Sequence, residues 1–395
     1  MKIIQFSDSF LPIMDGVGNV VYQYARNMGE KGHEVYVVAP QTDTGYRGRY
    51  PFEIVDYIGL PIPKMKQYRV GLPINDVHFL NRLNMIDADI VHVHSPFIAG
   101  QIGLAYAERK HVPVIATFHS KYYDDFLQVT GAPLLAEVGV KYVVDFYEKC
   151  DEVWAVSHSS ADVLRSYGYE GAIRVMENGT DIHEASSEDV KRACEEFHIQ
   201  EGPMLLYVGQ INWKKNLKCT LEAVSKLTRP YQMVLAGQGP NKEEIERFVK
   251  DLGIEDKVIF TGHILDHTLL NGLYKRADLF LFPSLYDTSG LVVREAAAVE
   301  TPSVVVRGSS AAEGIVHGEN GFLCENDSSS LAEVIEKALS DPKTLHQVGI
   351  KAKETIPIAW SLLVDRVLED YDAIGGSAVS DALEKIRQEY EEENK

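Results

Sequence analysis

Short apolar runs alternate with stretches of helical periodicity along most of the chain. The runs in the first half predict strands at Ile3–Phe6, Glu34–Val38, Ile90–Val93, Val114–Phe118, Val153–Val156 and Ile173–Met176. The stretches between them predict helices near Gly18–Glu30, Ala99–Arg109, Leu134–Glu148 and Ser160–Tyr167. Strands that are apolar throughout are buried on both faces, which is typical of a parallel sheet covered by helices.

The same pattern starts again in the second half. It predicts strands at Met204–Val208, Met233–Ala236, Lys257–Phe260, Leu279–Phe282 and Ser303–Val306. It predicts helices near Leu217–Leu227, Lys242–Leu252, Leu269–Arg276, Val292–Val299 and Leu331–Leu339. The chain is therefore expected to be an α/β protein with two doubly wound parallel sheets, in domains at 1–183 and 203–359. The polar, charged segment 184–202 is poor in strand-forming residues and is predicted to be the linker.

The tail, residues 360–395, follows neither repeat. Helical periodicity predicts two helices, Ser361–Tyr371 and Val379–Tyr390, separated by the Gly375-Gly376 pair. Apolar residues of the second helix form one stripe, made of Val379, Leu383, Ile386 and Tyr390. Such a stripe requires a surface to cover.

Composition narrows the class of protein. A length of 395 residues suggests two domains, and a net charge of -19 disfavours nucleic acid as the main partner. The four cysteines form no CxxC pair, which fits a reducing cytoplasm rather than a disulfide framework or a zinc site. The N-terminus has the pattern of a strand rather than of a signal peptide, and no apolar run is long enough to span a membrane.

Open parallel sheets bind ligands at the carboxyl ends of their strands, so functional residues are expected in the loops after strands. The loop after the first strand carries Gly16 and Gly18 before a helix, where backbone N–H groups can approach an anion. It lacks the third glycine of a dinucleotide fingerprint, and the alternative is a tight turn. His119 follows the fourth strand and could bond a sugar hydroxyl, although a lone histidine is more often structural.

The second half has the denser set of polar residues. Lys214 and Lys215 lie near a predicted helix start, where their charge opposes the helix dipole and favours an anionic ligand. The backbone N–H groups of Ser289, Gly290 and Leu291 open another helix and could hold a phosphate. Asp287 and Glu295 flank these amides, so we expect them to bind hydroxyls, although they could be ordinary capping acids.

These loops resemble family-four retaining glycosyltransferases, in order and along nearly the whole chain. The elements that carry the resemblance are Asp15-Gly16-Val17, Thr117-Phe118-His119, Asn178 to Asp181, Gly209 to Asn216, Gly237-Gln238-Gly239 and Asp287 to Glu295. Each is short, but six in order are specific. The resemblance implies the GT-B fold, in which two Rossmann-like domains face each other across a cleft. It implies a UDP-sugar donor as substrate, no cofactor and no metal ion.

The resemblance also implies a role for each matching residue. Lys215, Asp287 and His119 would act at the reacting sugar: Lys215 on the diphosphate, Asp287 on sugar hydroxyls and His119 beside the reacting centre. Further donor contacts would come from Gly16, Gln210, Ile264, Ser289, Gly290, Leu291 and Glu295, with Glu295 on the ribose and Ile264 by the base. The tail from about residue 360 would cross back onto the first domain.

Two positions depart from the family pattern. Gln210 stands where the family usually has arginine, so one phosphate-pairing cation is missing, and Lys214 is the residue that could replace it. Asp287 replaces the first glutamate of the family's paired acids, which withdraws the carboxylate by one methylene. Both departures bear on donor preference and rate.

The first loop, Ser7 to Pro12, and the segment Thr117 to Phe126 resemble the lipid-glycosylating branch, such as diacylglycerol glucosyltransferases. That branch uses UDP-glucose at the inner face of the membrane, so a cytoplasmic or peripheral membrane protein is expected. Residues assigned to the acceptor or the membrane are Lys64, Lys66, Arg69 and Tyr122. Basic residues near an anionic bilayer contribute about 1 kcal/mol each. The alternatives are a solvated loop at 61–70 and a soluble or polysaccharide-precursor acceptor.

Two other functions fit the same predicted fold. A UDP-sugar 2-epimerase would need acid and base carboxylates in its own pattern. A non-catalytic nucleotide-sugar binder is conceivable because of Gln210 and Asp287.

Overall fold

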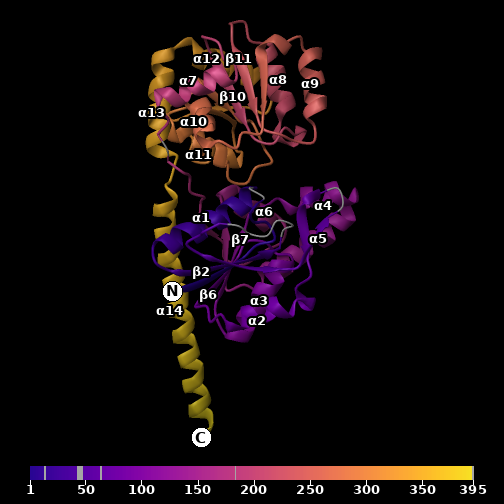
Figure 1. The fold of residues 1–395 in the computed structure, drawn as a ribbon, viewed down its shortest axis with the longest axis vertical. Coiled ribbons are helices and arrows are strands. Elements are labelled where there is room, and N and C mark those ends of the chain that lie inside the picture. Colours follow the sequence, from indigo (N-terminus) through magenta and orange to yellow (C-terminus); the bar gives the residue numbers. More distant parts are fainter. Residues whose placement is uncertain (13–14, 42–47, 63–64, 183, 394–395) are drawn as a thin grey trace. The chain divides into compact units, whose positions relative to one another are not determined.

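The computed structural model describes residues 1–12, 15–41, 48–62, 65–182 and 184–393, and for 62, 65–68 and 377–393 the backbone only. The chain forms two compact units. The first comprises Met1–Asn178 and Trp360–Lys395, and the second comprises Gly179–Ala359. Figure 1 shows each unit as a sheet with helices on its two faces.

The first unit contains a parallel sheet of seven strands in the order β3-β2-β1-β6-β7-β8-β9. These strands are β1 (Lys2–Phe6), β2 (Glu34–Pro40), β3 (Glu53–Tyr57), β6 (Ile90–Val93), β7 (Val114–Phe118), β8 (Glu152–Ala155) and β9 (Arg174–Val175). Every residue of β6 and β7 is buried, as expected for strands covered on both faces. The strand order reverses between β1 and β6, and open parallel sheets generally bind ligands at such a point.

The helices of the first unit are α1 (Gly16–Glu30), α2 (Val77–Met85), α3 (Ile98–Lys110), α4 (Tyr122–Thr130), α5 (Pro133–Tyr147), α6 (His158–Ser166) and α14 (Trp360–Glu393), with a 3-10 turn η1 at Pro73–Asn75. A hairpin of β4 (Gly59–Ile62) and β5 (Met65–Gly71) pairs antiparallel outside the main sheet. The sequence pattern missed this hairpin, α2 and α4, because none of them shows a sustained apolar repeat.

The second unit repeats the plan with six parallel strands in the order β12-β11-β10-β13-β14-β15. These are β10 (Met204–Val208), β11 (Gln232–Ala236), β12 (Val258–Gly262), β13 (Leu279–Leu281), β14 (Ser303–Val306) and β15 (Phe322–Cys324). The helices are α7 (Ser187–Glu196), α8 (Leu217–Ser225), α9 (Lys242–Asp251), α10 (His267–Arg276), α11 (Leu291–Ala298), α12 (Ser328–Ser340) and α13 (Pro342–Thr355). Short 3-10 turns are η2 (Trp213–Lys215), η3 (Glu255–Lys257) and η4 (Ser310–Ala312). Two doubly wound parallel sheets are therefore confirmed.

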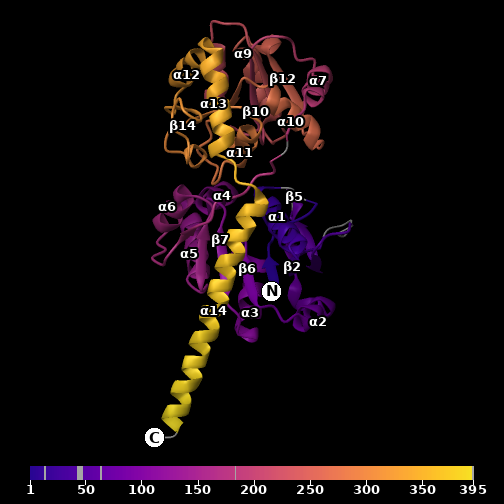
Figure 2. The ribbon, with the colours of Figure 1, turned by 90° about the vertical axis from the view of Figure 1, so that its left-hand side faces the viewer.

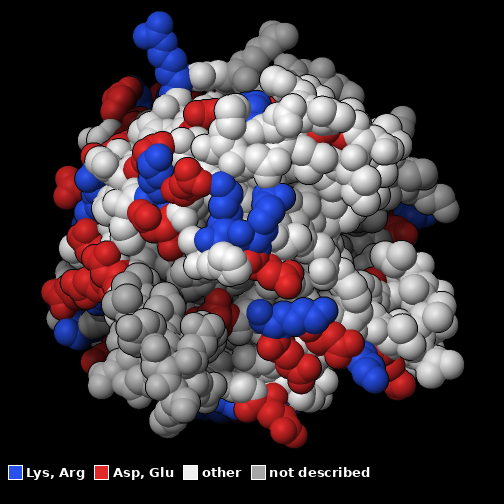
Figure 3. Space-filling view, turned by 90° about the horizontal axis from the view of Figure 1, so that it is seen from below, with Lys and Arg blue, Asp and Glu red and all other residues white. Residues whose placement is uncertain are grey.

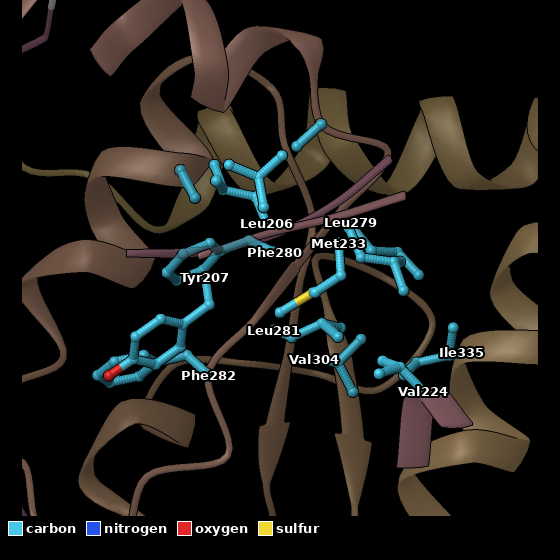
Figure 4. Close-up of a cluster of buried hydrophobic side chains, with 14 of the residues drawn as sticks. Leu206, Tyr207, Val224, Met233, Leu279, Phe280, Leu281, Phe282, Val304 and Ile335 are labelled. Atoms are coloured by element: carbon cyan, nitrogen blue, oxygen red, sulfur yellow. The ribbon is translucent and has the colours of Figure 1, made fainter. Parts of the chain in front are cut away.

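The core of the second unit consists of side chains from the strands and the covering helices. Figure 4 shows Leu206, Met233, Leu279 and Val304 from neighbouring strands together with Val224 and Ile335 from α8 and α12. The strand order reverses between β10 and β13. The loops after these two strands carry the conspicuous polar residues of this half.

The predicted linker at 184–202 is wrong, because it contains α7, a helix of the second unit. α7 packs closely on α10: a Cβ at Gly272 would lie 2.3 Å from the backbone oxygen of Asp189, and Arg192 pairs with Asp266 at 2.6 Å. Its polar composition concealed it, since Ala193 is its one fully buried residue. The unit boundary lies at Gly179 and Ala359, where the Thr180 N–H donates to the Ile358 carbonyl at 2.7 Å.

The tail is one helix, α14, rather than the two that the Gly375-Gly376 pair suggested. Figure 2 shows it as a single continuous rod. A helix tolerates glycine at a modest cost, and a Cβ at either glycine would meet no described atom within 4 Å. α14 belongs to the first unit, with Val364, Val367 and Tyr371 buried. The side chains of the predicted stripe, Val379 to Tyr390, lie outside the described residues.

Candidate functional site

Glycines hold the loop after β10 against its neighbour. A Cβ at Gly237 would lie 1.9 Å from the Gly209 carbonyl oxygen, and one at Gly239 would lie 2.3 Å from the Ile211 oxygen. The Ile211 N–H donates to the Gln238 carbonyl at 3.0 Å. The Gly237-Gln238-Gly239 turn therefore requires glycine because two backbones meet there.

Lys215 ends the turn η2 in this loop, and the next residue ties the loop to the one after β13. Asn216 adopts a left-handed conformation, with φ of 60°, and its side-chain amide donates to the Pro283 carbonyl at 2.9 Å. The Lys215 ammonium group reaches Asp287 Oδ1 at 2.7 Å. The two side chains are 14% and 22% exposed. The other carboxylate oxygen of Asp287 is buried and accepts no hydrogen bond from the described residues.

Both lysines of η2 also lie over one aromatic ring. The Lys214 and Lys215 ammonium nitrogens are 4.7 and 5.3 Å from the ring centre of Tyr286. Gln210 is exposed, and its backbone oxygen accepts the Tyr207 hydroxyl at 2.8 Å. Lys214 is therefore the second cation beside Lys215, and its ammonium group lies over the face of the Tyr286 ring.

α11 begins at Leu291, and within the described part of the chain its N-cap residue gives no side-chain hydrogen bond to the first amide groups. Its N-cap is Gly290, whose φ is 58° and at which a Cβ would lie 2.9 Å from the Ala311 Cα. Only glycine fits this position, and glycine brings no oxygen to accept the helix N–H groups. Ser289 precedes it and is partly exposed. Such a helix start, with two lysines in the same unit, suits an anion.

Glu295 lies one turn into α11. The Tyr274 hydroxyl donates to Glu295 Oε2 at 2.9 Å. Burial raises the pKa of the Glu295 carboxyl, and the Tyr274 hydrogen bond acts in the opposite direction.

Ile264, on the loop after β12, is partly buried and packs against the hydrophobic core of the second unit. That loop joins the glycine turn, because the Gly237 N–H donates to the Gly262 carbonyl at 2.9 Å.

In the first unit, the start of α1 carries a carboxylate. Asp15 is its N-cap: Oδ1 accepts the Gly18 N–H at 2.7 Å and Oδ2 accepts the Ser9 hydroxyl at 2.6 Å. Asp15 therefore brings a negative charge to one amide of this helix start, and the donor-phosphate contact expected at Gly16 stays a prediction. Gly16 itself is exposed, and a Cβ there would meet no atom of the described residues within 4 Å.

His119 follows β7 and belongs to a buried group of histidines. It lies 3.1 Å, Nε2 to Nδ1, from His94 after β6, which stacks on His92. Burial lowers the pKa of all three rings, that of His119 to about 3, so each is neutral at physiological pH.

Comparison with known proteins relates both units to one kind of enzyme. Residues 14–184 match the model "Glycosyltransferase Family 4" and residues 191–355 match "Glycosyl transferases group 1". The chain belongs to glycosyltransferase family 4. This glycosyltransferase is 27% identical over 354 residues to an alpha-monoglucosyldiacylglycerol synthase of Streptococcus pneumoniae, covering 87% of the chain and 79% of the relative. It is 25% identical over 393 residues to a GDP-mannose-dependent alpha-mannosyltransferase of Corynebacterium glutamicum, covering 94% of the chain and 88% of the relative.

Solved structures share the fold of this glycosyltransferase. Sucrose-phosphate synthase of Thermosynechococcus elongatus has a TM-score of 0.81 at 21% identity, covering 95% of this chain and 99% of that one. HepE of Anabaena, solved with UDP and glucose, has a TM-score of 0.75 at 18% identity, covering 94% of this chain and 100% of that one. The fold expected from the sequence, GT-B, is thereby confirmed.

The residues assigned to the acceptor or the membrane have different environments. Tyr122 is 6% exposed and packs on Phe118 and Phe126, so its ring does not face solvent as a membrane-contacting side chain would. Arg69 is partly buried and donates to the Gly59 carbonyl at 3.1 Å. The side chains of Lys64 and Lys66 lie outside the described residues.

Asp8 of this glycosyltransferase is a polar residue that the sequence did not single out. Its carboxylate follows β1 and accepts hydrogen bonds from the Ser95 hydroxyl at 2.6 Å and the Ala99 N–H at 3.0 Å. Burial raises its pKa. Its position after the first strand was the available signal, but its partners at the start of α3 are far away in sequence.

No three or more His, Cys, Asp or Glu side chains among the described residues are grouped to hold a metal ion. A cavity of about 390 Å³ lies at the amino-terminal edge of the first sheet, lined by Ala88, Val112, Tyr371 and others.

Proposed function

We propose that this glycosyltransferase moves a hexose, with glucose as the expected sugar, from a UDP-sugar to a membrane glycerolipid such as diacylglycerol. It would retain the anomeric configuration and use no metal ion. The observation that carries the donor half is the Lys215–Asp287 pair beside the uncapped start of α11, with Glu295 one turn into that helix.

The donor assignment follows from charge. A diphosphate needs cations or N–H donors, which Lys214, Lys215 and the first amides of α11 supply. Carboxylates would repel the diphosphate unless they bind hydroxyls, so the proposal assigns hydroxyl binding to Glu295 and Asp287. The Anabaena protein with 18% identity was solved with UDP and glucose, and this supports a UDP-sugar.

The proposed reaction breaks the bond between the sugar C1 and the donor phosphate oxygen and forms a bond between C1 and the acceptor oxygen. Attack from the face that the diphosphate leaves retains the configuration. The acceptor proton passes to an oxygen of the departing phosphate. Lys215 and the α11 amides would stabilise the charge that develops on the diphosphate, while Asp287 and His119 would orient the sugar.

A lipid acceptor is supported by two observations. The relatives from Streptococcus pneumoniae and Acholeplasma laidlawii, 27% and 25% identical, are named alpha-monoglucosyldiacylglycerol synthases. In the first unit, α5 exposes Leu134, Leu135 and Val138 to 71%, 54% and 62%. Apolar side chains gathered on a helix surface suit contact with lipid.

Charge alone does not select the membrane as partner. The net charge is -19, and the face in Figure 3 carries basic side chains interspersed with acidic ones. No described helix is long and apolar enough to cross a bilayer. Contact would therefore rest on apolar area on the protein surface.

The donor test presents radiolabelled UDP-glucose, UDP-N-acetylglucosamine and GDP-mannose with diacylglycerol vesicles or soluble sugars, with and without EDTA. We expect transfer from UDP-glucose to the lipid, unaffected by EDTA, with an α-linked product by NMR. Epimerised donor, or binding without transfer or hydrolysis, would instead favour a UDP-sugar 2-epimerase or a non-catalytic binder. Transfer only to soluble sugars would refute the lipid acceptor.

The membrane test uses flotation with vesicles of phosphatidylcholine, phosphatidylglycerol and diacylglycerol. Replacing Leu135 and Val138 with Asn should reduce flotation and transfer in vesicles, but should preserve transfer to diacylglycerol dispersed in detergent. Val316→Asn, at a position of the second unit that is 54% exposed, is the matched control. Equal flotation of all three proteins would contradict the role of α5.

A further inference from the structure

Buried polar side chains form a stack across two neighbouring strands of the first unit. His92 and His94 are two positions apart on and after β6, so they lie on one face of the sheet. Their rings stack with centres 4.1 Å apart at 26°. His119, after the adjacent β7, stacks next at 5.3 Å and 28° from His94. The three residues are 0%, 1% and 6% exposed.

His92 is held on both sides. Its Nε2 lies 2.7 Å from the Thr117 hydroxyl on β7, and its Nδ1 hydrogen-bonds the Tyr371 hydroxyl of α14. Either hydroxyl can donate or accept, so His92 is satisfied in either tautomer. It therefore provides a fixed surface on which His94 stacks.

His94 has one polar partner only among the described residues. Its Nδ1 lies 3.1 Å from Nε2 of His119, and its own Nε2 is buried with no hydrogen-bond partner. A neutral imidazole carries one N–H and one acceptor nitrogen, so the shared hydrogen bond has two arrangements. His94 donates to His119, or His119 donates to His94.

The unpartnered Nε2 distinguishes the two arrangements. If His119 donated, the proton of neutral His94 would sit on Nε2, as a buried N–H without an acceptor. If His94 donates from Nδ1, its Nε2 is a bare lone pair. Buried N–H groups without a partner are rarer in proteins than under-used acceptors, and leaving one unpaired costs free energy. The second arrangement is therefore favoured.

We infer that His94 is a positioning residue for His119: it donates Nδ1–H to His119 Nε2 and thereby holds that ring as the Nδ1–H tautomer. In this tautomer His119 carries its proton on Nδ1, and its Nε2 accepts the hydrogen bond from His94. In the proposed reaction, this N–H would donate to a sugar hydroxyl oxygen, which carries lone pairs. The use of this donor on the sugar rests on the proposed function, whereas the tautomer does not.

The first experiment measures the tautomer in the full-length protein labelled with ¹⁵N-histidine. Two-bond ¹H–¹⁵N spectra distinguish the Nδ1–H and Nε2–H forms, and His119→Gln assigns the signal by its loss. The wild type should show His119 as Nδ1–H. His94→Phe, which keeps a stacked ring but no donor, should shift His119 to the Nε2–H form or to a mixture. A wild-type His119 that carries its proton on Nε2 would overturn the inference.

The second experiment measures turnover with the nucleotide sugar that the donor screen identifies. His94→Phe should lower kcat by about tenfold or more, the value of one well-placed hydrogen bond, with a smaller change in donor KM. His94→Asn places an amide N–H near the position of Nδ1 and should recover most of that loss. Unchanged kcat in a folded His94→Phe protein, or equal loss in both variants, would refute the positioning role.

These outcomes separate two failures. A different donor or acceptor would refute the proposed function but leave the tautomer measurement unaffected. If His94→Phe does not fold, the wild-type spectrum and the His94→Asn variant still decide the inference.

Discussion

The ammonium group of Lys215 lies 2.7 Å from a carboxylate oxygen of Asp287, although 72 positions separate the two residues in the chain. They meet because β10 and β13 are adjacent, so that the loops after both strands leave the sheet at the same edge. The pair couples a cation proposed to bind diphosphate with an acid proposed to bind the sugar. Each charge compensates the other in the unliganded protein.

Because the pair is largely shielded from water, replacing Lys215 with Met should impair both activity and stability. We expect kcat to fall about 100-fold through loss of charge stabilisation, and the free energy of unfolding to fall by about 1–3 kcal/mol because Asp287 is left unpaired. Steady-state kinetics and urea denaturation measure the two effects. Adding Asp287→Asn to Lys215→Met should restore part of the free energy of unfolding and none of the activity. A kcat of Lys215→Met within twofold of the wild-type value would contradict the assignment.

Lys214 should serve as the second diphosphate cation in place of Gln210. Lys214→Gln is expected to weaken UDP binding by about fivefold, equivalent to about 1 kcal/mol, and to reduce its salt dependence. Isothermal titration calorimetry at two salt concentrations measures both. The exposed Lys218 on α8 provides the control, since Lys218→Gln should leave UDP affinity unchanged. Equal effects of the two changes would indicate that general charge, and not position, is responsible.

The raised pKa of Glu295 predicts a stability effect with a definite sign. Because burial raises the pKa in the folded state, the folded protein favours the protonated carboxyl, and its contribution to stability is lost as pH rises through that pKa. Glu295→Gln mimics the protonated form. It should therefore raise the melting temperature at pH 7–8, with the difference vanishing below about pH 4, the ordinary range of glutamate. Turnover should nonetheless be largely abolished, and full activity would refute the ribose assignment.

Tyr274 offers a separate test of the same carboxylate. The Tyr274 hydroxyl donates to the Glu295 carboxylate and lowers the pKa of Glu295, so Tyr274→Phe should raise the pKa of Glu295 further. If the carboxylate binds the donor ribose, the acidic limb of the pH profile of UDP affinity should move to higher pH. Tyr231→Phe, in the same unit, removes a buried hydroxyl that bonds no described residue and should leave the profile in place.

Gly16 can be tested independently of stability. Gly16→Ala adds a methyl group at the first turn of α1 that contacts no described residue, so folding should be unaffected or slightly favoured, by up to about 1 kcal/mol. If a donor phosphate approaches the backbone there, kcat/KM should fall at least tenfold. Gly375→Ala in α14, where a Cβ also contacts no described residue, is the matched control for helix propensity. Unchanged kcat/KM in Gly16→Ala would place the phosphate elsewhere.

Part of the site could be predicted because it depends only on the succession of elements along the chain. A strand, a loop and a helix in succession place Lys215, Asp287 and Glu295 at carboxyl ends of strands, whatever the details of packing. The ion pair between Lys215 and Asp287 could not be predicted, since it requires knowing that β10 and β13 are neighbours. Asp15 as the cap of α1 was equally hidden, because a capping geometry depends on the dihedral angles of one residue.

By itself, the sequence determined the fold class and the family, because apolar periodicity and ordered loop motifs are properties of the chain read in one dimension. The tertiary structure decided that α7 is part of the second unit, that α14 is one helix, and that His94 and His119 share a hydrogen bond. The physical reason is the same in each case. These features depend on contacts between strands and helices that are far apart in the sequence, and only the folded chain brings those elements together.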